Sequence, residues 1–258
     1  MDIDHTSDVT RDHPLILHCF ADFGVESEVL SGYGDVIRIG IKARNTNDSE
    51  PIRADAYDLP FDENVQFDLG FFHPLCKKWA DMTSISGDPD KEPNQIPRAR
   101  EIARKYCDYY VIENKPQAPL NDPIVLNGRM FGLPIAYERG FETNFRVPQP
   151  ARFKRFGDDK KAETSPFFYS ERSHRWWGSV KGYRADRYPK QHLAKNSIPA
   201  PYVHHVCRAW LSAYEEGSDI AATQTDYSDY DERMETKRRK NLNAPLTEFL
   251  AEDDGDAE

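Results

Sequence analysis

Short apolar runs alternate with amphipathic stretches through the first half of the chain. Four runs are rich in β-branched or aromatic residues and end at polar or turn residues: 15–20, 36–41, 65–72 and 109–114. Such runs are typical of strands buried on both faces of a parallel sheet. The intervening residues 25–31 and 96–107 are predicted helices. The pattern therefore indicates an α/β fold with a mostly parallel sheet, in which ligands bind beyond the carboxyl ends of the strands.

The second half of the chain is first basic and aromatic, and then acidic. Residues 146–190 contain 12 basic and five acidic side chains, a net charge of +7, so the remainder of the chain carries −17. Residues 201–214 have apolar side chains on one helical face, which predicts an amphipathic helix. Beyond residue 215 the chain is polar and charged, which is typical of disorder, with a charged helix predicted near 233–240.

The chain has 258 residues, a length that suits one compact domain with a small addition. The shifts in composition divide it into five segments. We expect a catalytic α/β core over 15–145 and a short basic and aromatic segment over 146–190. A helix that returns to the core follows over 191–215. The ends, 1–14 and 216–258, are predicted to be a flexible N-terminus and a charged, disordered tail.

Composition excludes several classes of protein. No stretch approaches the ~20 apolar residues that span a bilayer, and the acidic N-terminus lacks the apolar centre of a signal peptide. The four cysteines form no CxxC pair, so we expect free thiols in a reducing cytoplasm and no metal site. We also expect a monomer. The net charge of −10 is reminiscent of proteins from salt-loving cells.

Two strand ends carry side chains that suit catalysis. The run 65–72 is followed by His73-Pro74-Leu75-Cys76, and Glu113 lies near the end of the next run. A cysteine there can be a nucleophile if its thiolate is stabilised, and a partly buried glutamate can donate a proton. The alternative is a buried structural cysteine and a surface glutamate, and spacing alone leaves both open. No Walker, GxGxxG, HExxH or GxSxG motif is present.

Several short motifs resemble those of the DNA (cytosine-5) methyltransferases, and they occur in the order of that family. The similarity covers roughly residues 15–211 and is greatest to the short phage and archaeal-type branch. That family has a Pro-Pro-Cys turn, a Glu-Asn-Val motif, the segments Gly-Ser-Met-Phe-Gly-Leu and Arg-His-Arg-Leu-Phe-Glu, and a C-terminal Gly-Asn-Ser-Val. The corresponding segments here are HPLC (73–76), VIENKP (111–116), GRMFGL (128–133), RGFE (139–142) and NSIP (196–199).

The resemblance implies a Rossmann-like methyltransferase fold, with helices on both faces of the sheet, and methyl transfer to C5 of cytosine. Cys76 would add to C6 of the base as a thiolate, and Glu113 would hydrogen-bond to or protonate N3. Arg139 matches the second arginine of the family's Arg-x-Arg and would help to hold the base. The target cytosine would be flipped out of double-stranded DNA, which is the expected partner.

S-adenosylmethionine is the cofactor that the resemblance implies, but two cofactor positions depart from the family. Asp22 stands at the first glycine of Phe-x-Gly-x-Gly. Lys42 stands where an acidic residue normally binds the ribose hydroxyls, and a lysine cannot accept those hydrogen bonds. The positions that do match the cofactor motifs are Phe20, Gly24, Asp55, Pro74, Asn196 and Ser197.

The basic and aromatic segment 146–190 lies where the family places target recognition. Lysine and arginine contact phosphates, and aromatic rings stack on bases. Two alternatives remain open: a solvated face for the segment as a whole, and a place in the core for Trp176–Trp177. The predicted DNA contacts are Arg172, Arg175, Trp177 and Lys181.

The departures leave two functional hypotheses. The first is an active cytosine-5 methyltransferase, favoured by Cys76, Glu113 and Arg139. The second is an impaired protein of methyltransferase fold that binds DNA or a partner without catalysis. Asp22, Lys42 and the substitution of Tyr137 for the first arginine of Arg-x-Arg favour it. Among the remaining candidates, Cys19 and Cys207 are predicted to be inert core residues, and His204 and His205 packing or surface residues rather than ligands.

Overall fold

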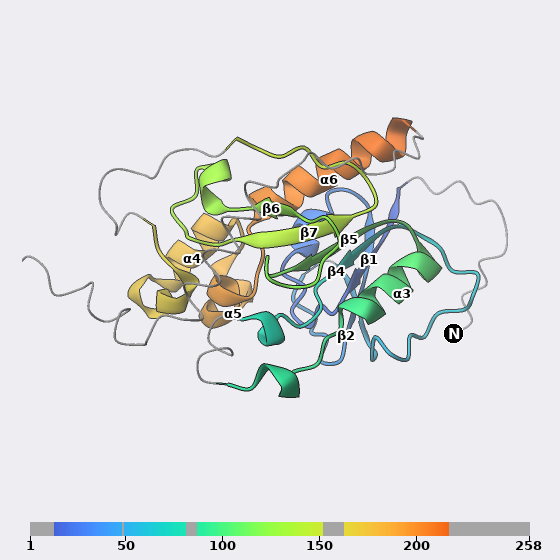
Figure 1. Ribbon diagram of the computed structural model, residues 1–258, viewed down its shortest axis with the longest axis horizontal. Helices are drawn as coiled ribbons and strands as arrows, with labels where there is room; N and C mark the ends of the chain where they lie inside the picture. Colours follow the sequence, from blue (N-terminus) through green and yellow to red (C-terminus); the bar gives the residue numbers. More distant parts are fainter. Residues whose placement is uncertain (1–12, 48, 81–86, 152–162, 217–258) are drawn as a thin grey trace, which may run out of the picture.

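A computed structural model describes residues 13–47, 49–80, 87–151 and 163–216 of the chain. Their centre is one seven-stranded sheet with the strand order β3-β2-β1-β4-β5-β7-β6 (Figure 1). Strands β1 to β5 are mutually parallel, and β7 is antiparallel to both of its neighbours, β5 and β6. The strand bounds are β1 Leu15–Cys19, β2 Asp35–Gly40, β3 Glu50–Arg53, β4 Phe67–Phe72, β5 Cys107–Asn114, β6 Ile124–Leu126 and β7 Arg139–Thr143.

The predicted parallel α/β sheet is confirmed, and the four apolar runs correspond to β1, β2, β4 and β5. Three strands lacked a recognisable run. Strand β3 contains Pro51 and is only partly buried, β6 has three residues, and β7 includes Arg139 and Glu142. Both charged side chains of β7 are nevertheless buried, because each forms an ion pair with another strand or helix.

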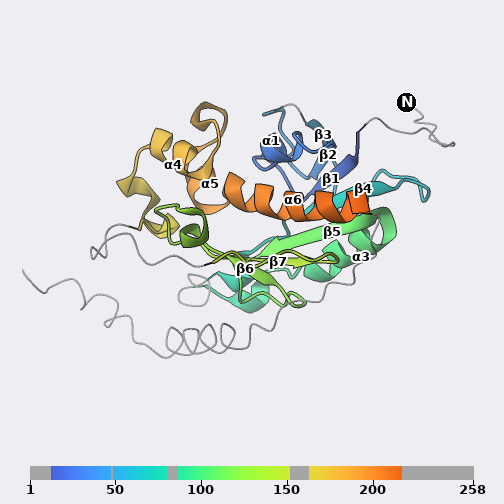
Figure 2. The ribbon, with the colours of Figure 1, turned by 90° about the horizontal axis from the view of Figure 1, so that it is seen from above.

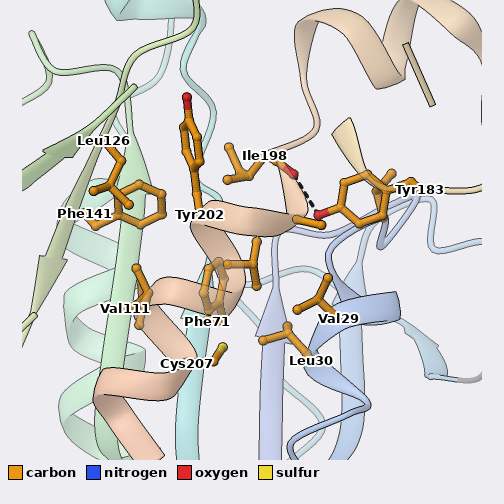
Figure 3. Close-up of a cluster of buried hydrophobic side chains, with 14 of the residues drawn as sticks. Val29, Leu30, Phe71, Val111, Leu126, Phe141, Tyr183, Ile198, Tyr202 and Cys207 are labelled. Atoms are coloured by element: carbon orange, nitrogen blue, oxygen red, sulfur yellow. Dashed lines mark hydrogen bonds between the residues drawn. The ribbon is translucent and has the colours of Figure 1, made fainter. Parts of the chain in front are cut away.

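Helices cover both faces of the sheet. Helix α3 (Ile96–Tyr106) packs on one face, with a core that includes Leu17 and Phe72. The short α1 (Ser27–Leu30) and the long α6 (Ala200–Glu216) lie on the opposite face (Figures 1 and 2). In the core beneath α6, Tyr202 and Cys207 lie among Phe71, Val111 and Phe141 of the sheet (Figure 3). The predicted helices near 25–31, 96–107 and 201–214 are thus present.

A cluster of short helices lies at one end of the sheet, beside α6 (Figures 1 and 2). It contacts both α1 and the loop before it: the ring centroids of Phe23 in the loop and His192 are 4.3 Å apart, and Arg187 forms an ion pair with Glu28 of α1. Its elements are η5 (Pro166–Glu171), α4 (His174–Lys181), η6 (Ala185–Arg187) and α5 (Lys190–Lys195). Shorter 3-10 turns elsewhere are η1 (Lys77–Trp79), η2 (Pro89–Lys91) and η3 (Gly128–Phe131).

The proposed domain boundaries stay a prediction. Residues 1–12, 152–162 and 217–258 lie outside the described residues, as does the predicted helix near 233–240. Within the described part of the chain, no helix is long and apolar enough to cross a membrane.

A buried arginine holds the loop that follows β1. The side chain of Arg38 on β2 has no exposed surface, and its guanidinium donates to the carbonyls of Ala21, Asp22 and Arg44 and to Ser49 Oγ. Gly24 has a φ of +59°, and a Cβ there would lie 2.2 Å from Arg38 Cδ. A glycine is therefore required at position 24, because any side chain would collide with the arginine that satisfies the loop.

We expect Arg38→Met to unfold at a much lower urea concentration than the wild type. Each buried acceptor left without a partner costs ~1–3 kcal/mol, so losing three carbonyl contacts should lower the free energy of unfolding by at least about 3 kcal/mol. Arg53→Met is the matched control, because Arg53 is an exposed arginine at the end of β3 that donates to one carbonyl, of Ala43. Equal urea midpoints for the two variants would contradict this role of Arg38.

Candidate active site at the carboxyl edge of the sheet

Glu113 and Arg139 meet at the carboxyl edge of the sheet. Strand β7 runs antiparallel to β5, so its first residues lie beside the last residues of β5, with Asn114 opposite Gly140. This register brings Arg139 Nε to 3.3 Å from Glu113 Oε1. Arg139 is 1% exposed and Glu113 is 5% exposed, so both charges are removed from water. Each charge therefore needs the other for its stabilisation.

The end of β4 adds a second partner to the same carboxylate. His73 Nδ1 lies 3.0 Å from Glu113 Oε2, on the opposite side of the carboxylate from Arg139. Burial opposes protonation of His73, but the carboxylates of Glu26 and Glu113 raise its pKa overall. Asn114 Nδ2 donates to the carbonyl of Pro74 at 3.0 Å, which attaches the turn after β4 to the end of β5.

Cys76 lies on this turn, at the N-terminal cap of η1, and its side chain is partly exposed. It lies close enough to Arg139 to influence the pKa of that guanidinium. The other three cysteines are buried, and burial raises the pKa of each thiol, that of Cys19 to about 12. The prediction that Cys19 and Cys207 are core residues is therefore confirmed. Of the four thiols, Cys76 is the one that a substrate can reach.

Two further side chains enclose Arg139. The Tyr137 hydroxyl accepts a hydrogen bond from Arg139, and Lys181 Nζ lies 3.4 Å from the centroid of the Tyr137 ring. Burial acts to lower the pKa of Arg139, but Tyr137, Glu113 and Cys76 together raise it well above its ordinary value. Lys181 differs, because burial and then the charge of Arg139 lower its pKa well below the ordinary value. Arg139 is therefore the cation of this group that pairs with Glu113.

The loop after β1 carries Asp22, one of the two positions that differ from the cofactor motifs of the cytosine-5 methyltransferases, and it contacts the other, Lys42. Phe20 has a φ of +61°, which is rare for an aromatic residue. The carboxylate of Asp22 extends over the end of β2, where Oδ1 accepts a hydrogen bond from the backbone N–H of Lys42 at 2.8 Å. The Lys42 side chain is exposed. A carboxylate is thus present at the end of β2, but the β1 loop supplies it.

The segment before α6 returns to the β1 loop, although 172 residues separate the two. The backbone N–H of Ile198 donates to Glu26 Oε1 at 2.7 Å. Ser197 is buried, and its hydroxyl donates to the carbonyl of Leu193. Asn196 is exposed at the end of α5, with its side-chain amide 3.4 Å from His192. Of the two residues predicted to bind cofactor here, only Asn196 has an exposed side chain.

Asp55 is exposed and forms a local turn in which its carboxylate accepts from the backbone N–H of Tyr57. It lies near Cys19, since its charge affects the pKa of that thiol. His204 and His205 on α6 bond to protein groups, with ring nitrogens 3.0 Å from the Tyr33 hydroxyl and 2.7 Å from the Pro148 carbonyl. These partners agree with packing and surface roles.

Two of the four predicted DNA contacts need correction. Trp177 has no exposed surface, and its indole N–H donates to the carbonyl of Tyr169. Lys181 is also fully buried, and its ammonium group donates to the carbonyl of Ser197. Neither side chain is placed to contact DNA. Arg175 is exposed and Arg172 partly exposed, so these two stay predictions.

Two buried residues at this edge, His18 and Glu26, were not predicted as site residues, although the sequence contains a signal for each. His18 is the one polar side chain in the apolar run 15–20, and it is fully buried. A titratable residue within a buried strand indicates a polar partner, here Ser27 Oγ at 2.7 Å from Nδ1. Glu26 gave a weaker signal, because an acidic residue before a short helix is usually exposed, whereas this one is 6% exposed.

Comparison with known proteins supports a fold rather than a close relationship. No protein-family model and no curated protein sequence matches the chain. The solved structure of the methyltransferase EhMeth from Entamoeba histolytica superposes with a TM-score of 0.54 at 9% identity, over 79% of this chain and 99% of that one. An S-adenosylmethionine-dependent methyltransferase from Mesorhizobium loti is similar over 45% of this chain and 55% of its own, with 14% identity and a TM-score of 0.29, too low to support an argument.

The strand order, the antiparallel β7 and the likeness to EhMeth together define a Rossmann-like α/β methyltransferase fold. The fold predicted from the sequence is therefore confirmed. At 9% identity the likeness extends to the fold alone.

We expect Arg139→Met to lower the free energy of unfolding by about 3–5 kcal/mol, because it leaves the buried Glu113 carboxylate without its main cation. The double variant Arg139→Met with Glu113→Gln removes both charges and should recover much of that loss. Urea unfolding of the two single variants and the double variant measures the coupling between the residues. Strictly additive losses would show that the ion pair does not stabilise this edge.

Proposed function

We propose that the chain is an S-adenosylmethionine-dependent methyltransferase that acts on C5 of cytosine in double-stranded DNA. The observation that carries the proposal is the gathering of a reachable thiol, Cys76, with the buried Glu113–Arg139 pair at one edge of a methyltransferase-fold sheet. That edge is where ligands bind in open α/β sheets. The motif resemblance and the geometry, which are independent lines of reasoning, thus favour the same three side chains.

The residues of the β1 loop fit the proposed cofactor. S-adenosylmethionine supplies a methyl group on sulfur, and its ribose hydroxyls need an acceptor at the end of β2. Lys42 cannot accept, but the half-buried carboxylate of Asp22 reaches that position from the preceding loop. We infer that Asp22 takes the role of the missing acid. Phe20, Gly24, Asp55, Pro74 and Asn196 are the other residues we assign to cofactor binding.

The chain's own residues have separate tasks in the proposed reaction. The Cys76 thiolate adds to C6 of a flipped cytosine, while Glu113 in its acid form donates a hydrogen bond or its proton to N3, so that the addition builds electron density at C5. Arg139 holds the carboxyl group of Glu113 in place and offers its charge to the base. After C5 accepts the methyl group, the C5 proton passes to a water molecule, the electrons of the C5–H bond restore the C5–C6 double bond, and the bond between C6 and sulfur breaks to regenerate the Cys76 thiolate.

Arg172 and Arg175 are the residues that we propose for phosphate contact. Arg172 follows η5 and Arg175 lies in the first turn of α4. The Arg172 guanidinium is 5.2 Å from the centroid of the Trp176 ring. Trp176 is partly exposed, so it is the member of the tryptophan pair that remains available for stacking.

A second candidate function is DNA or partner binding without catalysis. The observation that favours it is the hydrogen bond between His73 and Glu113 Oε2, which occupies an oxygen that a base would otherwise contact. The two candidates differ in covalent chemistry, and one experiment separates them.

Duplex DNA containing 5-fluorocytosine should trap a covalent complex with the wild-type chain in the presence of S-adenosylmethionine. Fluorine replaces the proton that must leave C5, so the sulfur of Cys76 stays bonded to C6. Cys76→Ser should abolish the adduct, because a hydroxyl is a far weaker nucleophile. A denaturing gel measures it.

Cys107→Ala is the control for general thiol reactivity, since Cys107 is buried and should not influence trapping. If the wild-type chain binds both DNA and cofactor, yet forms no adduct across a library of target sequences, the binding-only function replaces methyl transfer.

Asp22→Asn should weaken S-adenosylmethionine binding by ~10- to 100-fold, which corresponds to a lost charged acceptor of ~1.5–3 kcal/mol. Asparagine keeps an oxygen for the hydrogen bond from Lys42, so the loop should hold its shape. Lys42→Ala is the matched control and should leave the affinity within a few fold of the wild type. Calorimetric titration measures both, and unchanged binding by Asp22→Asn would remove Asp22 from the cofactor site.

A further inference from the structure

Three side chains from separate segments converge beside the site. His18 lies on β1, Glu26 precedes α1, and His73 follows β4. One potential ligand atom from each lies within 4.8 Å of the others. Glu26 Oε2 is 4.0 Å from His18 Nε2 and 3.9 Å from His73 Nε2. Two imidazoles and a carboxylate are a donor set that suits zinc and similar divalent transition metals better than magnesium or calcium.

The facing atoms of both histidines lack protein partners. Among the described residues, His18 Nε2 and His73 Nε2 are buried side-chain atoms without a hydrogen bond. Buried polar atoms are nearly always satisfied, so two such atoms aimed at one carboxylate indicate a missing ligand. The His18 side chain is fully buried and that of His73 is 14% exposed, which leaves an approach from the His73 side.

Each of the three side chains is held from behind by a second interaction. His18 Nδ1 lies 2.7 Å from Ser27 Oγ, and His73 Nδ1 lies 3.0 Å from Glu113 Oε2. Glu26 uses Oε1 to accept from the Ile198 N–H, which turns Oε2 toward the histidines. Metal-binding histidines commonly have this arrangement, with the second ring nitrogen bonded to an oxygen so that the first presents its lone pair to the metal.

We propose that His18 Nε2, His73 Nε2 and Glu26 Oε2 bind a divalent transition cation of the zinc class. The metal–ligand bonds of such an ion are ~2.0–2.2 Å long, which places tetrahedral ligand atoms about 3.3–3.6 Å apart. Glu26 Oε2 must therefore approach each histidine nitrogen by about half an ångström from its present 3.9–4.0 Å. Three protein ligands leave a fourth position for water or another small ligand. The carboxylates of Glu26 and Glu113 offset the charge of the ion. The site does not depend on the proposed methyl transfer, and it revises the expectation of no metal.

The sequence did not predict this site because its ligands have no local spacing. His18 and Glu26 are eight residues apart, and His73 lies on another strand, 55 residues after His18. Only the parallel pairing of β1 with β4 places His18 beside Phe71, two residues before His73.

The test is a titration of the untagged, chelator-treated full chain with ZnCl₂ in a calorimeter, and with CoCl₂ in a spectrophotometer. Neither DNA nor S-adenosylmethionine is present, so the result is separate from any test of methyl transfer. We expect one saturable site per chain and an intense visible Co²⁺ absorption that Zn²⁺ removes. His18→Ala and His73→Ala should each weaken Zn²⁺ binding by at least a hundredfold.

Glu26→Gln keeps an oxygen for the Ile198 N–H and should fold like the wild type, but it should bind Zn²⁺ at least tenfold more weakly. The paired variant His204→Ala with His205→Ala, on the exposed side of α6, should bind like the wild type. The proposal fails if the wild type shows no saturable binding. It also fails if Glu26→Gln binds equally well, or if the α6 histidine variant is the one that loses binding.

Discussion

A carboxylate buried at the end of a parallel strand requires positive charge nearby, and the carboxyl edge of this sheet is organised around Glu113. Arg139 supplies that charge because β7 runs antiparallel to β5 and therefore begins where β5 ends. His73 contacts the other carboxylate oxygen from the end of β4. Breaking a buried ion pair costs far more than its formation gains, so the relative positions of β4, β5 and β7 are closely determined. The position of Cys76, on the turn between His73 and η1, follows from these contacts.

A second set of contacts closes this edge from the other side. Glu26 of the β1 loop accepts a hydrogen bond from the Ile198 N–H, and Lys181 of α4 donates one to the Ser197 carbonyl. The segment before α6 is therefore held at two neighbouring residues, Ser197 and Ile198. Burying Lys181 is unfavourable for a charged ammonium, and this is why its pKa is lowered well below the ordinary value. Through Lys181 the helical cluster contacts both the segment before α6 and the Tyr137 ring.

The departures from the family pattern are coupled in space. Asp22 and Lys42 are 20 residues apart, yet the Asp22 carboxylate accepts from the Lys42 backbone N–H. The β1 loop thus places one negative charge at the end of β2, where Lys42 has none to offer. Arg38 supports this arrangement, because its guanidinium holds the carbonyls of the loop that carries Asp22.

The amino-acid sequence alone was sufficient for the class of fold, because buried parallel strands and amphipathic helices have local hydrophobic patterns that need no knowledge of contacts. It also indicated Cys76 and Glu113, because strand ends in such a fold share one edge, whereas Arg139 was predicted from the motif resemblance. Strands β6 and β7 lacked such a pattern, since β6 is short and the charges of β7 are buried only through partners elsewhere in the chain. The tertiary structure alone decided that Trp177 and Lys181 are interior, that Asp22 reaches the end of β2, and that His18, Glu26 and His73 converge. Each of these depends on contacts between residues far apart in the chain, and such contacts leave no periodic signal in the sequence.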